Sequence, residues 1–177
     1  MAHNPITSNL IDLIKDQVVS YERLLRGKNL ELRLDLPHQL PEMKLDPILF
    51  KEALQNLLDN AMDYNQELGG FVDLTVTEAE HEYGQIEGQG KVTTHAEPSI
   101  LIRVTNPGLD IPKEEMEKIF DQFYRSSQAL QHHPNGNGLG LFLAQAIIQQ
   151  HGGKIEVESQ KGLTSFTICL PWRTIKV

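Results

Sequence analysis

Cysteine is nearly absent from this sequence, and no stretch of it stays apolar for long. Cys169 is the only cysteine among 177 residues, so no disulfide can form within the chain, which fits a reducing cytoplasm. A membrane-spanning helix needs about 20 predominantly apolar residues in a row, and no such run occurs. A secretory signal pattern is also missing. We therefore expect a cytoplasmic protein that does not itself insert into a membrane.

Basic residues are fewer than acidic ones. The chain has 16 lysines and arginines against 24 aspartates and glutamates, which gives a net charge of −8. This balance argues against nucleic acid, or an anionic membrane surface, as the main partner. An anionic nucleotide would need hydrogen-bond donors placed locally and a divalent cation.

The length suits one domain of ordinary size, and 40% hydrophobic residues suffice for its core. We interpret residues 1–5 as a cloning remnant or the end of a linker, and residues 6–177 as a single domain. Helices are predicted at about 10–25, with Thr7 or Ser8 as the cap, at 46–64 with Asp46 as the cap, after Pro112, and from 139 to about 151.

Alternating or continuous apolar patterns predict strands at about 30–36, from 71, from 99, at 154–160 and at 164–171. Between them, residues 80–98 are predicted to be a long hairpin insertion, and residues 125–138 a polar loop of lid-like length. This order predicts an α/β two-layer sandwich, a mixed and mostly antiparallel sheet with helices on one face.

Three glycines precede the last helix, at positions 136, 138 and 140. Glycine costs roughly 1 kcal/mol relative to alanine inside a helix, so this stretch is predicted to be a loop that leads into the helix. The free N–H groups at a helix N-terminus suit a phosphate. A flexible loop that merely caps a buried helix explains the pattern equally well.

The second helix contains two asparagines in register. Asn56, Asn60 and Tyr64 are spaced by four, so they project from one face. Asparagine is a poor residue for the middle of a helix, and its carbonyl is a suitable ligand for Mg²⁺. Two such residues on one face indicate a polar binding site at a cleft, although a solvent-exposed helix face would also accommodate them.

Several motifs follow one another along the chain: "NLLDNAMDY", then "TNPGLDIPKEEMEKIFDQFYRS", then "GNGLGL" with "HGGKIEVES" and "TSFTICLP". Together they resemble the catalytic domain of bacterial sensor histidine kinases, in a superfamily with gyrase-type topoisomerases, heat-shock chaperone ATPases and mismatch-repair ATPases. The resemblance runs from about Ile6 to Pro171. It implies a Bergerat-type fold that holds ATP and Mg²⁺ under a mobile lid.

The resemblance also implies the partners. In two-component signal transduction, the γ-phosphate would pass to a histidine on a separate dimerisation domain, and from there to the receiver domain of a response regulator. No segment here matches the family's phosphoacceptor motif, so we expect a monomeric catalytic fragment. Its parent could be the cytoplasmic part of a membrane-bound sensor.

The resemblance assigns roles to the asparagine helix and the lid. Asn60 would bind Mg²⁺, Asn56 would reach phosphate or metal-bound water, and Tyr64 would pack near the adenine. Further along the chain, Phe120 and Phe123 would anchor the base of the lid, Arg125 would offset phosphate charge, and Gly136, Gly138, Leu139 and Gly140 would wrap the triphosphate.

The sequence departs from the family in its first glycine box. Asn106 replaces the aspartate that accepts a hydrogen bond from the adenine amine, so adenine binding is expected to be weaker. Gly108 is retained, Asp110 replaces a second glycine and adds negative charge at the pocket edge, and Ile111 follows as in the family.

Two other positions bear on the chemistry. Asp63 stands where the kinases carry a basic residue. Asn56 stands where the related ATPases place a glutamate base, so efficient ATP hydrolysis is not expected.

Two alternatives remain, a degenerate nucleotide-sensing or protein-interaction module without phosphotransfer, and an ATPase or serine kinase of the same superfamily. His132 and His133 are interpreted as solvated rather than metal-binding, and His151 as a helix cap.

Overall fold

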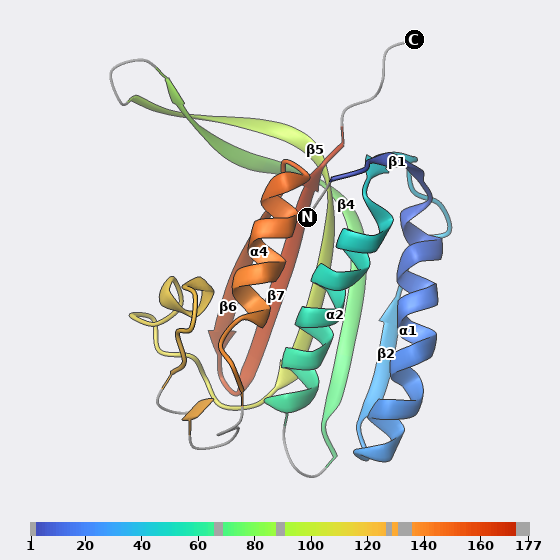
Figure 1. Cartoon of the computed structure of the whole chain (residues 1–177), viewed down its shortest axis with the longest axis vertical. Helices are drawn as coiled ribbons and strands as arrows, with labels where there is room; N and C mark the ends of the chain where they lie inside the picture. Colours follow the sequence, from blue (N-terminus) through green and yellow to red (C-terminus); the bar gives the residue numbers. More distant parts are fainter. Residues whose placement is uncertain (1–2, 66–68, 88–90, 127–128, 131–135, 173–177) are drawn as a thin grey trace.

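The computed structural model describes residues 3–65, 69–87, 91–126, 129–130 and 136–172. Helices cover one face of a five-stranded sheet (Figure 1). The elements are β1 (Ile6–Ser8), α1 (Leu10–Gly27), β2 (Glu31–Asp35), β3 (Met43–Leu45), α2 (Pro47–Asp63), β4 (Phe71–Glu87), β5 (Lys91–Pro107), the 3₁₀ turn η2 (Lys118–Phe120), α4 (Gly140–Gln150), β6 (Lys154–Gln160) and β7 (Leu163–Pro171). The predicted two-layer α/β fold is confirmed.

The sheet is mixed, with strand order β2-β4-β5-β7-β6. Only the β2–β4 pair is parallel among these neighbours; the other three pairs are antiparallel. The register pairs Asn106 on β5 with Thr164 on β7. The end of β5 therefore lies beside the turn between β6 and β7.

Alternation along the strands separates the two faces of the sheet. On β5, Ile100, Ile102 and Val104 are fully buried and belong to the hydrophobic core under the helices. Helix α2 contributes the densest part of that core because Leu54, Leu57 and neighbouring residues are buried along its length. This packing fixes α2 over the sheet, where its Asn56 side chain lies beside Gly140 at the start of α4.

The start of α2 is tied to the end of α4. Asp46 caps α2 as predicted, since its Oδ1 accepts from the N–H groups of Ile48 and Leu49. The Asn4 N–H bonds its other oxygen, and these backbone hydrogen bonds hold the pKa of Asp46 below its usual value. The Asp46 N–H donates to Nε2 of His151, the C-cap of α4.

Several local predictions need correction. The cap of α1 is Asn9, whose side chain accepts from the N–H groups of Ile11 and Asp12, whereas Thr7 and Ser8 lie in β1. Strands β1 and β3 pair over only three residues each, too few for an alternating pattern to be visible. The helix expected after Pro112 is a run of turns ending in η2, because so short a segment gains few helical hydrogen bonds.

The insertion at 80–98 is a continuation of the sheet. Strand β4 runs on to Glu87 and β5 starts at Lys91, with unbroken antiparallel pairing between them. Their far halves form an arm that leaves the sheet (Figure 1). We call residues 80–87 and 91–98 the hairpin arm.

Candidate functional site

Helices α2 and α4 bring the asparagines and the last glycine of the loop together. A Cβ placed on Gly140 would lie 3.2 Å from Oδ1 of Asn56, so α4 begins close enough to α2 that a larger residue would press on the Asn56 amide. The Asn56 amide donates to the Glu52 carbonyl one turn earlier. One turn later, the half-buried side chain of Asn60 makes no hydrogen bond to any part of the chain that the structure describes.

Within the residues that the structure describes, the N-terminus of α4 has no side-chain cap. Its N-cap residue is Leu139, which donates its own N–H to Oδ1 of Asn137. The following backbone N–H groups are the free donors of a helix N-terminus. Gly138 has φ +67 and its carbonyl accepts from the Phe123 N–H, which anchors this loop to the segment after η2.

The end of β5 meets the end of α2 at Asn106. This side chain is only 2% exposed, and its Nδ2 donates to the carbonyls of Tyr64, at 3.3 Å, and Pro107, at 3.1 Å. Because both neighbours are carbonyl acceptors, the side-chain nitrogen of Asn106 must face them. Its Oδ1 therefore points the other way and can accept a hydrogen bond. Gly108 lies against the same Tyr64 carbonyl, and a Cβ on it would come closer than 3.0 Å to that oxygen.

The structure thus explains the asparagine at position 106 by hydrogen bonding, and an Asn106→Asp variant tests this. The variant loses both N–H donors and turns carboxylate oxygens toward two carbonyls in a buried position. We expect it to be less stable by about 2–4 kcal/mol at pH 7. Because burial raises the pKa of the new carboxyl in the folded state, the loss should shrink as the pH falls from 7 through that raised pKa, and it should change no further below about 4, the pKa of the unfolded chain.

Urea unfolding at pH 7 and pH 4 measures both effects. Asn137→Asp is the matched control, because Asn137 is exposed and, among the described residues, its side chain accepts one hydrogen bond near a helix N-terminus and donates none. A control variant that is neutral or slightly stabilised is expected. An Asn106→Asp variant as stable as the parent at pH 7 would contradict the two-donor explanation.

Asp110 and Ile111 are held by the β6–β7 hairpin. The carboxylate of Asp110 accepts from the Gly162 N–H at 2.8 Å, while the Gly162 carbonyl accepts from the Gly108 N–H at 2.9 Å. The Ile111 N–H donates to Oγ of Ser159. Gly162 and Ser159 therefore position the first glycine box. The sequence showed them only as part of a hairpin, because the partners are about 50 residues away.

The base of the predicted lid is held by one aromatic side chain rather than two. Phe120 is buried against Phe166, edge to face at 6.3 Å. Phe123 has φ +65 and is 66% exposed, so its side chain does not pack as the expected anchor, and only its backbone bonds the loop. Arg125 lies beside Gly136, 3.3 Å from a Cβ placed there, and donates to the Ala129 carbonyl.

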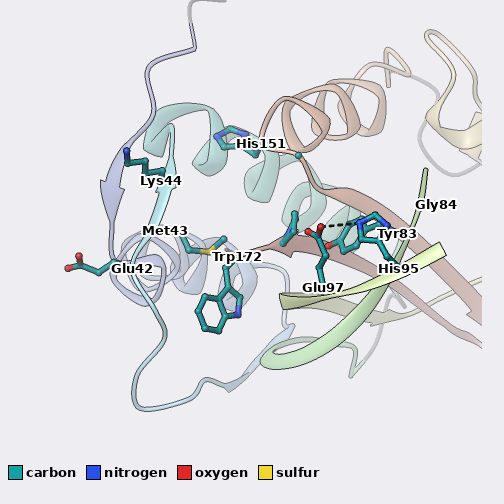
Figure 2. A pocket seen from close by; sticks show the side chains of 11 residues that line it. Glu42, Met43, Lys44, Tyr83, Gly84, His95, Glu97, His151 and Trp172 are labelled. Atoms are coloured by element: carbon teal, nitrogen blue, oxygen red, sulfur yellow. Dashed lines mark hydrogen bonds and ion pairs between the residues drawn. The ribbon is translucent and has the colours of Figure 1, made fainter. Parts of the chain in front are cut away.

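The remaining predicted features fall outside this cluster. Asp63 pairs with Lys28 at 3.0 Å, beyond the end of α1. His132 and His133, with part of the predicted lid, lie outside the described residues. A cavity of about 520 Å³ lies at the opposite end of α4, lined by residues such as His95, Glu97 and Trp172 (Figure 2). It contains none of the residues predicted to bind nucleotide.

The cluster joins an uncapped helix N-terminus, an asparagine pair and a glycine-lined strand end, which are the parts that the sequence resemblance requires. The family described as histidine kinase-, DNA gyrase B-, and HSP90-like ATPase matches residues 45–174. The chain belongs to this family. The predicted recognition, a catalytic ATP-binding domain of a histidine kinase, is confirmed.

Individual relatives of the chain are histidine kinases, in agreement with the family match. The signal transduction histidine-protein kinase ArlS of Staphylococcus epidermidis is 33% identical over 174 residues, covering 96% of this chain and 34% of that protein. The sensor histidine kinase WalK of Bacillus subtilis is 29% identical over 157 residues, 88% of this chain and 23% of that protein. This member of the ATPase family thus spans about a third or less of these kinases.

Solved structures extend the agreement to the fold. The catalytic domain of histidine kinase ThkA superposes with a TM-score of 0.72 at 27% identity, covering 97% of this chain and 98% of that one. The structure of ThkA in complex with the response regulator TrrA gives 0.73 at 24% identity, with 99% and 44% covered. No helix within the described part of this ATPase-family chain is long and apolar enough to cross a membrane.

Proposed function

We propose that this domain binds ATP with Mg²⁺ and donates the γ-phosphate to a histidine on a separate dimerisation domain. The observation that carries the proposal is the contact between Gly140 and Asn56. It brings the N–H groups at the start of α4 beside the Asn56 amide, one turn of α2 from Asn60. An anion at the helix terminus and a cation at the asparagines would then be neighbours, as a metal-bound triphosphate requires.

Each part of the cluster has a role in this proposal. The backbone N–H groups at the start of α4 bind phosphate oxygens, and the guanidinium of Arg125 adds positive charge from the loop side. Oδ1 of Asn106 accepts from the exocyclic amine of adenine, since its Nδ2 is committed to two carbonyls. A guanine carbonyl at that place would face an acceptor, so the site should prefer adenine.

The donor set fits a hard cation. Asn60 offers an amide oxygen that nothing in the described part of the chain occupies, and Asn56 stands one turn away. Mg²⁺ bound there would neutralise charge on the β- and γ-phosphates. The chain itself contributes positioning and fixed donors, and neither asparagine can take a proton from water. Transfer to an external imidazole is therefore favoured over hydrolysis.

Two departures from the family are locally compensated, which weakens the alternative of a degenerate module. The charge of Asp63 is paired with Lys28. The carboxylate of Asp110 is bound by the Gly162 N–H. Neither carboxylate is left without a partner beside the proposed phosphate position.

The relatives suggest the next acceptor. ThkA has been solved in complex with a response regulator, and ArlS is a signal transduction histidine-protein kinase. We propose by analogy that the phosphoryl group passes from the histidine to the receiver domain of a response regulator.

The deciding experiment is a calorimetric titration of the domain with a non-hydrolysable ATP analogue, with and without Mg²⁺, beside the GTP analogue. We expect a Kd well below 1 mM for the ATP analogue, tightened by Mg²⁺, and binding to the GTP analogue weaker by at least about tenfold. The absence of binding at millimolar analogue would favour a degenerate interaction module. Steady ATP hydrolysis by the domain alone would favour an ATPase.

A further inference from the structure

A second group of potential ligands lies far from the proposed nucleotide site. His81 on β4, Glu156 on β6 and Cys169 on β7 each present one ligand atom, and these atoms lie within 4.8 Å of one another. Nε2 of His81 is 3.2 Å from Oε1 of Glu156. This spacing is close to that of two ligands on one tetrahedral zinc ion, given metal–ligand distances of about 2.0–2.2 Å.

The sheet and the hairpin arm build this group together. Ile168 and Leu170 point into the core under the helices, so Cys169 between them faces the helix-free side of the sheet. Lys154 pairs with Cys169 across β6 and β7, which places Glu156 diagonally beside it on the same face. The arm bends toward the β6 edge (Figure 1), bringing His81 over these residues.

The arm covers two of the three side chains, whereas the side chain of Glu156 stays 44% exposed. Cys169 is fully buried although it lies on the face without helices, and His81 is only 18% exposed. Nζ of Lys154 donates to the Glu82 carbonyl and lies 5.4 Å from the ring centroid of Tyr83, so β6 also holds the arm from below. The group is therefore partly dehydrated before any ion binds.

We propose that His81, Glu156 and Cys169 bind a zinc-class divalent cation that fastens the hairpin arm to the sheet. Imidazole nitrogen, thiolate sulfur and carboxylate oxygen form a ligand set typical of Zn²⁺ and Co²⁺. The ligands come from three strands that are distant in sequence, so the ion closes a tertiary contact rather than a local loop. Water would take the fourth position.

Binding of the cation releases one proton, which comes from the thiol of Cys169. Burial, with the carboxylate of Glu156 beside it, raises the pKa of the Cys169 thiol to about 12, so the sulfur is protonated before the ion binds. Coordination breaks the S–H bond, forms a sulfur–metal bond and releases the proton to water. Lys154, which lies 2.8 Å from Oε1 of Glu156, must give up that contact while it keeps its bond to Glu82.

Cobalt titration of the full chain tests the proposal independently of nucleotide binding. Because Cys169 is the only cysteine, a thiolate-to-cobalt charge-transfer band can arise only from this position. We expect the band to saturate at one Co²⁺ per chain, with a Kd of roughly micromolar or tighter. Added Zn²⁺ should abolish the band and raise the thermal midpoint of unfolding.

Variants identify the other ligands. His81→Ala and Glu156→Gln should each weaken Co²⁺ binding at least about tenfold, whereas Lys154→Met should strengthen it. His95→Ala is the matched control, because His95 lies on the same arm but bonds Glu97, and it should leave the titration unchanged. Two results overturn the proposal. One is cobalt binding without the thiolate band, and the other is a band that survives in both His81→Ala and Glu156→Gln.

Discussion

A Gly108→Ala variant is expected to unfold about 10 °C below the parent domain and to lose most of its nucleotide affinity. The added Cβ would meet the Tyr64 carbonyl at less than 3.0 Å, and neither a backbone carbonyl nor a Cβ can turn away by a side-chain rotation. To relieve this clash, the end of α2 and the end of β5 must move apart. That movement stretches the 3.3 Å bond from Asn106 to Tyr64 and strains the bond from Gly108 to Gly162.

Such overpacking costs about 3 kcal/mol, which is a large part of the stability of a typical domain. Differential scanning calorimetry, followed by titration with the ATP analogue below the midpoint, separates the two losses. Gly27→Ala is the control, because nothing lies within 4 Å of a Cβ there and the position is helical. It should be neutral or slightly stabilising. A Gly108→Ala midpoint within a degree or two of the parent would contradict the close packing.

The sequence predicted the main elements because their signals are local. Apolar spacing and the cap at Asp46 located α2, and the pattern "KIEVESQ" matches β6 residue for residue. Sequence spacing also placed Asn56 and Asn60 on one helix face. The meeting of Asn56 with Gly140 was implied by family resemblance alone, since 84 residues separate the two positions.

The features that the sequence did not predict depend on distant partners. Asn106 looked like a weakened aspartate until its two carbonyl acceptors were visible. Phe123 is expected from the sequence to anchor the base of the lid, but its backbone is left-handed and its side chain is exposed. The group around Cys169 exists only because the hairpin arm bends over the sheet, and no spacing in the sequence encodes that bend.

An Asn60→Ala variant is expected to lose the contribution of Mg²⁺ to nucleotide binding while it keeps the fold. Asn56 already donates to the Glu52 carbonyl, whereas the side chain of Asn60 has no partner in the described part of the chain. Asn60 is therefore the freer ligand, and its removal leaves no packing defect of consequence. Binding of the ATP analogue without Mg²⁺ should stay within about twofold of the parent, and the tightening by Mg²⁺, about 10- to 100-fold, should disappear.

Phosphotransfer gives the second measurement for the same variant. If the cation offsets charge that develops during transfer, the rate to a supplied histidine-bearing domain should fall by about 100-fold or more at saturating nucleotide. Gln55→Ala is the matched control, an exposed amide on the same helix, and it should change neither quantity. An Asn60→Ala domain that still binds more tightly with Mg²⁺ would show that the cation is held elsewhere. The asparagine face of α2 would then be an ordinary polar surface.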